Sequence, residues 1–157
     1  MGLNNGFEMT KACHLCGISK YTLFETPDWS VLLNFDQNYP GRILVNAKRH
    51  MENLPSLTSE EWKDLHTVIL RSEKMIKKAF PEVNVLNWSC LMNHAFKEKP
   101  YNSHVHWHVF PRHDKPVSLG EITWTDERFG NHYGYKKENI LTDEKLEMIF
   151  TYVLKHA

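Results

Sequence analysis

The sequence predicts a mixed α+β fold, in which an antiparallel sheet carries a long amphipathic helix on one face and a second helix closes the chain. Two observations support this. Short strand-like segments, separated by turn residues, lie on both sides of one long helical segment, and another helical segment lies near the C-terminus. With 157 residues, 41% hydrophobic and 24% charged, the chain has the size and composition of a single domain spanning residues 1–157.

Three strands are expected in the first third of the chain. They cover residues 22–25, 30–35 and 42–46, which are rich in β-branched, aromatic and other apolar side chains. The dipeptide Pro40-Gly41 marks a turn between the last two. The short connections favour an antiparallel meander.

A long helix is expected next. Thr58-Ser59-Glu60-Glu61 has the pattern of a capping box, which satisfies the free backbone N–H groups at a helix start. Pro81 is expected to stop the helix. We expect one apolar face of this helix to cover the sheet. The residues of that face are Trp62, Leu65, Ile69, Ile76 and Phe80.

A hairpin with a long connection should follow the helix. Residues 83–92 are expected to form one strand, 93–103 a polar loop and 104–110 the antiparallel partner strand. Pro111 cannot donate to the ladder and is expected to end that strand.

Beyond Arg112 the sequence shows no clear period until the last helix. Thr142 has the residue type of an N-cap at its start. The apolar positions of this helix are Leu146, Ile149, Phe150 and Val153.

Charge and hydropathy exclude several classes of partner. Lysine plus arginine equals aspartate plus glutamate at 19 each, so no overall field attracts nucleic acid. No apolar run approaches the roughly 20 residues of a membrane-spanning helix, and the polar start of the chain lacks the regions of a signal peptide. We therefore expect a soluble, cytoplasmic protein without a nucleic-acid or membrane partner.

The three cysteines differ in context. Cys13 and Cys16 form a Cys-x-x-Cys pair, which in a reducing compartment is more often a metal or redox site than a disulfide. A pair without a metal remains the alternative. Cys90 lies within an apolar run and is interpreted as a small buried hydrophobe.

The most informative segment is 104–112, which reads His-Val-His-Trp-His-Val-Phe-Pro-Arg. Because side chains alternate along a strand, His104, His106 and His108 should line one face about 7 Å apart. A half-exposed strand or an accidental metal-binding tract is the alternative. The large apolar residues between the imidazoles favour instead a strand that the core holds rigidly, with the three imidazoles free to act together on its other face. Those expected to pack into the core are Val105, Trp107, Val109 and Phe110.

This segment resembles the signature of the histidine triad (HIT) superfamily, three histidines that alternate with hydrophobic residues. The ending from Val109 to Arg112 resembles the branch that cleaves dinucleoside polyphosphates. The resemblance implies that His106 attacks the α-phosphorus of a nucleotide and forms a covalent nucleotidyl-histidine, which water then hydrolyses. It also implies that His108 contacts the phosphate oxygens.

The resemblance also implies a structural zinc ion. Residues 42–50 resemble the family's strand, basic pair and following histidine, and zinc-containing members use that histidine with the first of the triad. The implied ligands are Cys13, Cys16, His50 and His104. Four protein ligands leave no open coordination position for catalysis.

Four polar residues are expected to bind the substrate. Asn34 lies where family members place an Asn or Asp that binds the ribose hydroxyls, although a turn residue at a strand end is the alternative. Asn93 lies where the family carries an Asn or Gln that orients the phosphate. The common Gly-Gln-Ser/Thr segment before the triad is replaced by residues 97–103, in which Asn102 and Ser103 can supply polar contacts.

The resemblance therefore implies a nucleotide hydrolase or nucleotidyl transferase, with diadenosine polyphosphates as preferred substrates and a homodimer as the assembly. Alternatives are an adenosine phosphoramidate hydrolase, a transferase similar to the hexose-phosphate uridylyltransferases, and a nucleotide-binding module without turnover. Intact His106 and His108 argue against the last, because a binding module needs no nucleophile.

Overall fold

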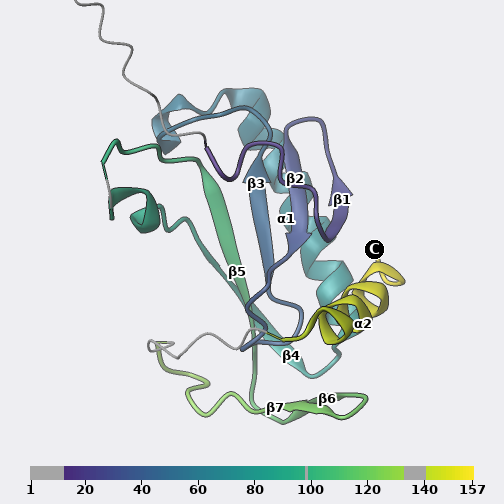
Figure 1. Ribbon diagram of the computed structural model, residues 1–157. Coiled ribbons are helices and arrows are strands. Elements are labelled where there is room, and N and C mark those ends of the chain that lie inside the picture. The colour runs from purple at the N-terminus through teal and green to yellow at the C-terminus, as the bar shows by residue number, and fades with distance from the viewer. Residues whose placement is uncertain (1–12, 98, 133–140) are drawn as a thin grey trace, which may run out of the picture.

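The main sheet has five strands in the order β1-β2-β3-β5-β4, and every neighbouring pair is antiparallel (Figure 1). The computed structural model describes residues 13–97, 99–132 and 141–157. The five strands are β1 (Thr22–Glu25), β2 (Trp29–Leu33), β3 (Ile43–Ala47), β4 (Val83–Ser89) and β5 (His106–His113). The predicted α+β class is confirmed.

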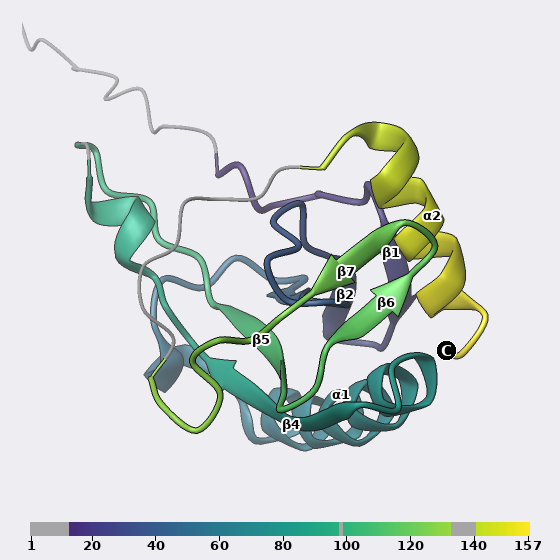
Figure 2. The ribbon, with the colours of Figure 1, turned by 90° about the horizontal axis from the view of Figure 1, so that it is seen from below.

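Two helices pack on this sheet. Helix α1 (Ser59–Ala79) covers one face, and α2 (Asp143–Leu154) lies beside β1 and contacts α1 (Figure 2). The capping box is confirmed. The Thr58 hydroxyl accepts from the backbone N–H of Glu61, and the Glu61 carboxylate accepts from the backbone N–H of Thr58. The remaining helical turns are η1 (Leu54–Ser56) and η2 (Asn93–Phe96).

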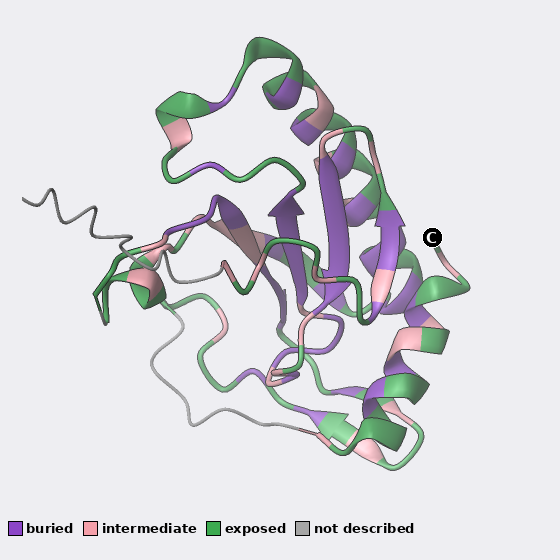
Figure 3. Cartoon of the chain, turned by 45° about the horizontal axis from the view of Figure 1, so that its top comes forward, coloured by how far each residue is buried: buried purple, intermediate pink, exposed green. Residues whose placement is uncertain are grey.

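The core lies between α1 and the sheet. Val31, Val45 and Val109 come from three adjacent strands and are fully buried together with Val68 and Ile76 of α1. Figure 3 shows that the strands of the main sheet are largely buried. The opposite face of the sheet carries the even-numbered side chains of β5, which include His106 and His108. One face therefore holds the strand in place while the other remains available for chemistry.

Trp62 was predicted to pack on the sheet, but it is 44% exposed. The buried stripe of α1 begins instead at Glu61 and Leu65. Glu61 accepts two hydrogen bonds from Arg49 in addition to its capping role, and its backbone carbonyl accepts the indole N–H of Trp29. These contacts set the rotation of the first helical turn and leave Trp62 facing outward.

The predicted bounds of β5 were also wrong at both ends. The strand begins at His106 rather than His104. The residues just before it bond instead to the segment that follows β3, where the N–H of Val105 donates to Met51 O at 2.8 Å. It continues through Pro111 to His113. The ladder to β3 ends at Val109, so on that side no partner strand requires a donor from Pro111.

A small second sheet after β5 was not predicted. Its strands β6 (Val117–Leu119) and β7 (Ile122–Trp124) form a hairpin whose turn begins at Gly120, at φ +59°. A glycine at the first of two turn residues is typical of such hairpins. The indole N–H of Trp124 donates to Gln37 O at 2.6 Å and ties the hairpin to the loop after β2.

Within the described residues, no helix has both the length and the apolar character needed to cross a membrane.

Replacing Thr58 by alanine should lower the free energy of unfolding by about 1 kcal/mol, because the N–H of Glu61 then loses its capping partner. Urea denaturation measures the change. Thr67→Ala, at an exposed position within α1, is the matched control and should not destabilise the protein. Equal effects of the two substitutions would contradict a capping role.

Candidate functional site

Two cysteines and two histidines meet at one end of the sheet. Cys13 and Cys16 lie in the turn before β1, His50 follows β3, and His104 precedes β5. Their side-chain nitrogen and sulfur atoms all lie within 4.8 Å of one another. The Nδ1 atom of His104 is 3.3 Å from Cys13 Sγ, 3.5 Å from Cys16 Sγ and 3.2 Å from His50 Nδ1. The structure thus brings together the four predicted metal ligands.

These spacings fit a tetrahedral ion. With zinc–nitrogen bonds of about 2.0 Å and zinc–sulfur bonds of about 2.3 Å, the edges of the tetrahedron measure about 3.3 Å between two nitrogens and about 3.5 Å between nitrogen and sulfur. The observed distances are 3.2 Å for the two nitrogens and 3.3 to 3.5 Å for nitrogen and sulfur. This Cys2His2 group can therefore bind a metal ion.

His104 is oriented for this role by a backbone group. Its Nε2–H donates to the carbonyl of Ala47 at 2.8 Å, which leaves the Nδ1 lone pair directed at the cysteines. The ring is only 2% exposed, and burial lowers its pKa. A neutral ring is the form that a metal ion requires.

His106 is held by the next backbone group. Its Nδ1 lies 2.7 Å from the carbonyl oxygen of His104, and since a carbonyl only accepts, Nδ1 carries the proton. In the neutral ring Nε2 therefore carries the lone pair. Burial lowers the pKa of His106, although the bond to His104 works in the opposite direction. Burial thus favours the neutral form of the His106 ring.

The two histidines of β5 face each other. The Nε2 atoms of His106 and His108 are 3.2 Å apart, and because His106 accepts at this atom, His108 must donate. The Nδ1 atom of His108 is buried and has no hydrogen-bond partner in the described part of the chain. Burial, then His106, then Arg42 lower the pKa of His108 to about 4.

Phe110 lies on the histidine face, not in the core under α1 as predicted. Its ring centroid is 6.2 Å from that of His108, and the guanidinium of Arg42 lies 4.4 Å from the Phe110 ring. Arg42 also pairs with Asp36. The even residue number could have shown this, because strand alternation places Phe110 with His106 and His108.

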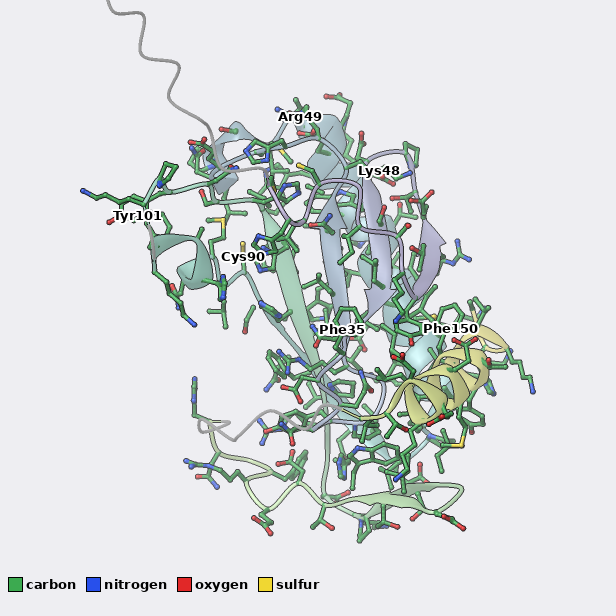
Figure 4. All side chains as sticks on the ribbon, in the orientation of Figure 1. Phe35, Lys48, Arg49, Cys90, Tyr101 and Phe150 are labelled. Carbon is green, nitrogen blue, oxygen red and sulfur yellow. The ribbon has the colours of Figure 1, made fainter. Side chains whose placement is uncertain are left out.

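A cavity of 310 Å³ opens in front of these histidines. Leu44 of β3 and Met92 and Leu91 after β4 contribute to its apolar lining, and exposed Phe35 lies on the side opposite α1 (Figure 4). The polar residues among its described lining are the three triad histidines, His14, Asn34, His94 and Asn102. A mostly apolar slot with a few polar groups is typical of sites for small organic ligands.

Only two of the four predicted substrate residues line the cavity. Asn34 and Asn102 are in its wall, and Asn34 Oδ1 also accepts the backbone N–H of Asp36 at 2.9 Å. The turn and binding roles of Asn34 are thus compatible. Asn93 is exposed in η2 and is not part of the lining. Ser103 is buried, and its hydroxyl donates to the Glu52 carbonyl at 2.7 Å.

Sequence reasoning missed His14 and His94 as cavity residues. His14 lies between two candidate metal ligands, and that position is the signal that could have placed it beside the triad. His94 carries no comparable signal. Cys90 is half-buried against the core, in agreement with its interpretation as a small hydrophobe, and burial raises the pKa of its thiol.

Arg112 does not face the cavity either. Its guanidinium forms a buried ion pair with Asp126 and donates to the backbone carbonyls of Arg128 and Asn131. It therefore anchors the segment after β7 to the end of β5.

The chain matches one protein family and several solved structures. The profile of the HIT domain matches residues 17–115. A hypothetical histidine triad nucleotide-binding protein of Sulfolobus tokodaii has a TM-score of 0.66 at 17% identity, over 92% of this chain and 91% of that one. A zinc-bound histidine triad family protein of Mycobacterium smegmatis has a TM-score of 0.55 at 16% identity, over 86% and 84%.

The NitFhit protein of C. elegans also shares the fold, with a TM-score of 0.59 at 22% identity. The match covers 87% of this chain and 27% of that longer one. No match was found among the curated proteins compared. At these identities the solved structures show a common fold.

The imidazole of His108 should remain neutral down to about pH 4, because burial lowers its pKa from 6.5 to about 4. Unfolded His108 binds a proton near pH 6.5, so its contribution to stability is constant above that pH and is lost as the pH falls toward 4. Nitrogen NMR of labelled histidines measures the titration, and His108→Gln assigns the signal. A His108 ring that is protonated at about pH 5.5 would contradict the burial argument.

Proposed function

The chain belongs to the HIT domain family, and from this premise we propose a nucleotide hydrolase or nucleotidyl transferase that acts at the α-phosphate through a covalent nucleotidyl-histidine. Family membership itself indicates nucleotide hydrolase or transferase activity. The nucleotide-binding protein among the solved structures with the same fold supports a nucleotide as the ligand. The covalent route is supported by the geometry of one residue.

That residue is His106. Donation of Nδ1–H to the His104 carbonyl leaves the Nε2 lone pair on the cavity side, beside His108. We infer that Nε2 attacks the α-phosphorus and forms an N–P bond. The bond from phosphorus to the leaving group breaks, and its electron pair stays on the leaving atom.

His108 assists this step. Its Nε2–H donates to His106 at 3.2 Å and can turn to a phosphate oxygen or to the leaving group when Nε2 of His106 bonds to phosphorus. Water then attacks phosphorus, the N–P bond breaks, and the pair returns to Nε2. The products of this second step are a nucleoside monophosphate and a proton. In a transferase another acceptor takes the place of water.

The nucleoside is expected to occupy the apolar part of the cavity. Leu44 and Met92 can contact the base, and the Nδ2 group of Asn34 can donate to the ribose while its Oδ1 remains bound to the backbone of Asp36. Diadenosine polyphosphates are the proposed substrates because the ending from Phe110 to Arg112 resembles that of the corresponding branch. Adenosine phosphoramidate is the alternative substrate.

We further propose that Cys13, Cys16, His50 and His104 hold a zinc ion, and that its role is structural. The donor set and the distances fit a closed tetrahedral site, and a zinc-bound protein with the same fold exists. Such an ion ties the turn before β1 to the start of β5. All four positions are protein ligands, so the ion takes no part in the chemical step.

We also infer a homodimer, from the same family resemblance. Strand β4 is an outer strand of the sheet, and its Val85 is 44% exposed. An outer strand of a sheet can pair with a second copy of the chain.

His106→Ala should reduce turnover by roughly a thousandfold or more, because the nucleophile is lost while its neighbours remain. The assay is incubation with labelled diadenosine polyphosphate and, separately, adenosine phosphoramidate. Alkaline quenching should preserve the N–P bond and show label on wild-type His106 only. His66→Ala, on the exposed side of α1, is the matched control and should keep full activity.

A fully active His106→Ala variant would overturn the assignment of the nucleophile. If the wild type forms neither product nor labelled histidine with either substrate, the enzyme hypothesis is wrong, and a nucleotide-binding module is the remaining interpretation.

Metal analysis should find about one zinc per chain. Cys13→Ser should lose the metal and unfold at a lower temperature, because the turn before β1 is no longer tied to His104. Cys90→Ser is the control, since Cys90 lies outside the four-residue group, and it should retain the metal. Full zinc content in Cys13→Ser would contradict the proposed ligand set.

A further inference from the structure

A second pair of imidazoles also lines the cavity. His14 belongs to the turn between the two cysteines, and His94 belongs to η2. Their ring centroids are 5.8 Å apart with an interplanar angle of 65°. Both line the same cavity as His106 and His108. Two segments far apart in sequence thus bring their histidines into contact at one place.

This pair lies at the mouth of the cavity. Both rings belong to exposed residues, whereas His106 is only 9% exposed and lies deep in the same cavity. Neither His14 nor His94 belongs to the hydrophobic core, and His14 is not one of the grouped metal ligands. Core packing and metal binding therefore do not explain their position.

A polyphosphate substrate needs groups at the mouth of the cavity that can donate hydrogen bonds to its phosphate oxygens. No lysine, arginine or acidic residue is among the described residues that line the cavity. The chain also lacks the Gly-Gln-Ser/Thr segment that family members carry before the triad. Ser103 cannot replace it by donation, because its hydroxyl already donates to Glu52. Beyond the triad and the proposed ribose contact Asn34, the remaining polar lining residues are His14, His94 and Asn102.

We propose that His14 and His94 bind the phosphate oxygens of the leaving group and so favour polyphosphate substrates over phosphoramidates. An imidazole offers an N–H donor when neutral and two donors with a positive charge when protonated, and both forms suit an anionic oxygen. The proposal rests on the proposed function, because it names the leaving-group side of the same site. Through His14, the turn that carries Cys13 and Cys16 would then contact the substrate directly.

The kinetic test compares two substrates that differ in their leaving group. The ratio of kcat/KM for diadenosine polyphosphate to kcat/KM for adenosine phosphoramidate should fall about ten- to a hundredfold in His14→Ala and in His94→Ala, the loss expected for one hydrogen bond to a charged group. His66→Ala should leave the ratio unchanged. An unchanged ratio in both cavity variants would overturn the proposal.

A binding test separates this proposal from the proposed function. In a His106→Ala background, calorimetry gives the affinities for ATP and AMP, which differ only in the phosphates beyond the first. Adding His14→Ala or His94→Ala should lower the ATP affinity at least about tenfold more than the AMP affinity. This result would support the pair even if the wild type turned over neither substrate.

Equal losses for ATP and AMP would overturn the proposal whatever the turnover. Zinc content is measured for each variant, because His14 lies between Cys13 and Cys16. If His14→Ala loses its metal, His94→Ala decides the outcome, since η2 contributes no residue to the metal group.

Discussion

One hydrogen bond connects the two chemical centres of this protein. It runs from Nδ1 of His106 to the carbonyl oxygen of His104 over 2.7 Å. The ring of His104 lies in the Cys2His2 group, while its carbonyl fixes the proton of His106 on Nδ1. The lone pair of His106 therefore remains on Nε2, the atom that attacks phosphorus in the mechanism we propose. A change in the position of His104 would disturb both the Cys2His2 group and the orientation of the His106 ring.

The sheet keeps that bond in place. Strand β5 lies between β3 and β4: His106 pairs with Asn46 of β3, and His108 pairs with Leu44 of β3 and Ser89 of β4. Fully buried Val109, on the other face, packs into the core beneath α1. A site built on such an element holds its side chains more precisely than a site on a loop. The proposed leaving-group contacts differ, since His14 and His94 come from short turns rather than from the sheet.

Local sequence patterns predicted the fold class and the common face of the triad histidines, whereas the other candidate site residues came from the family resemblance. The capping box at Thr58 needs only its own turn, and strand alternation alone brings His106 and His108 together. Features that depend on distant partners were missed or misplaced. Pro111 continues β5 because the β3 ladder has already ended, Ser103 turns to a carbonyl far away in sequence, and His94 meets the cavity only through the fold.

The nitrogen atom of His106 that bonds to phosphorus reveals the orientation of the ring during turnover. Protein labelled with nitrogen-15 at either Nε2 or Nδ1 of histidine is quenched in alkali during turnover of a diadenosine polyphosphate. We expect a one-bond phosphorus–nitrogen coupling at Nε2 of His106 and none at Nδ1. A coupling at Nδ1, or at any histidine other than His106, would contradict it.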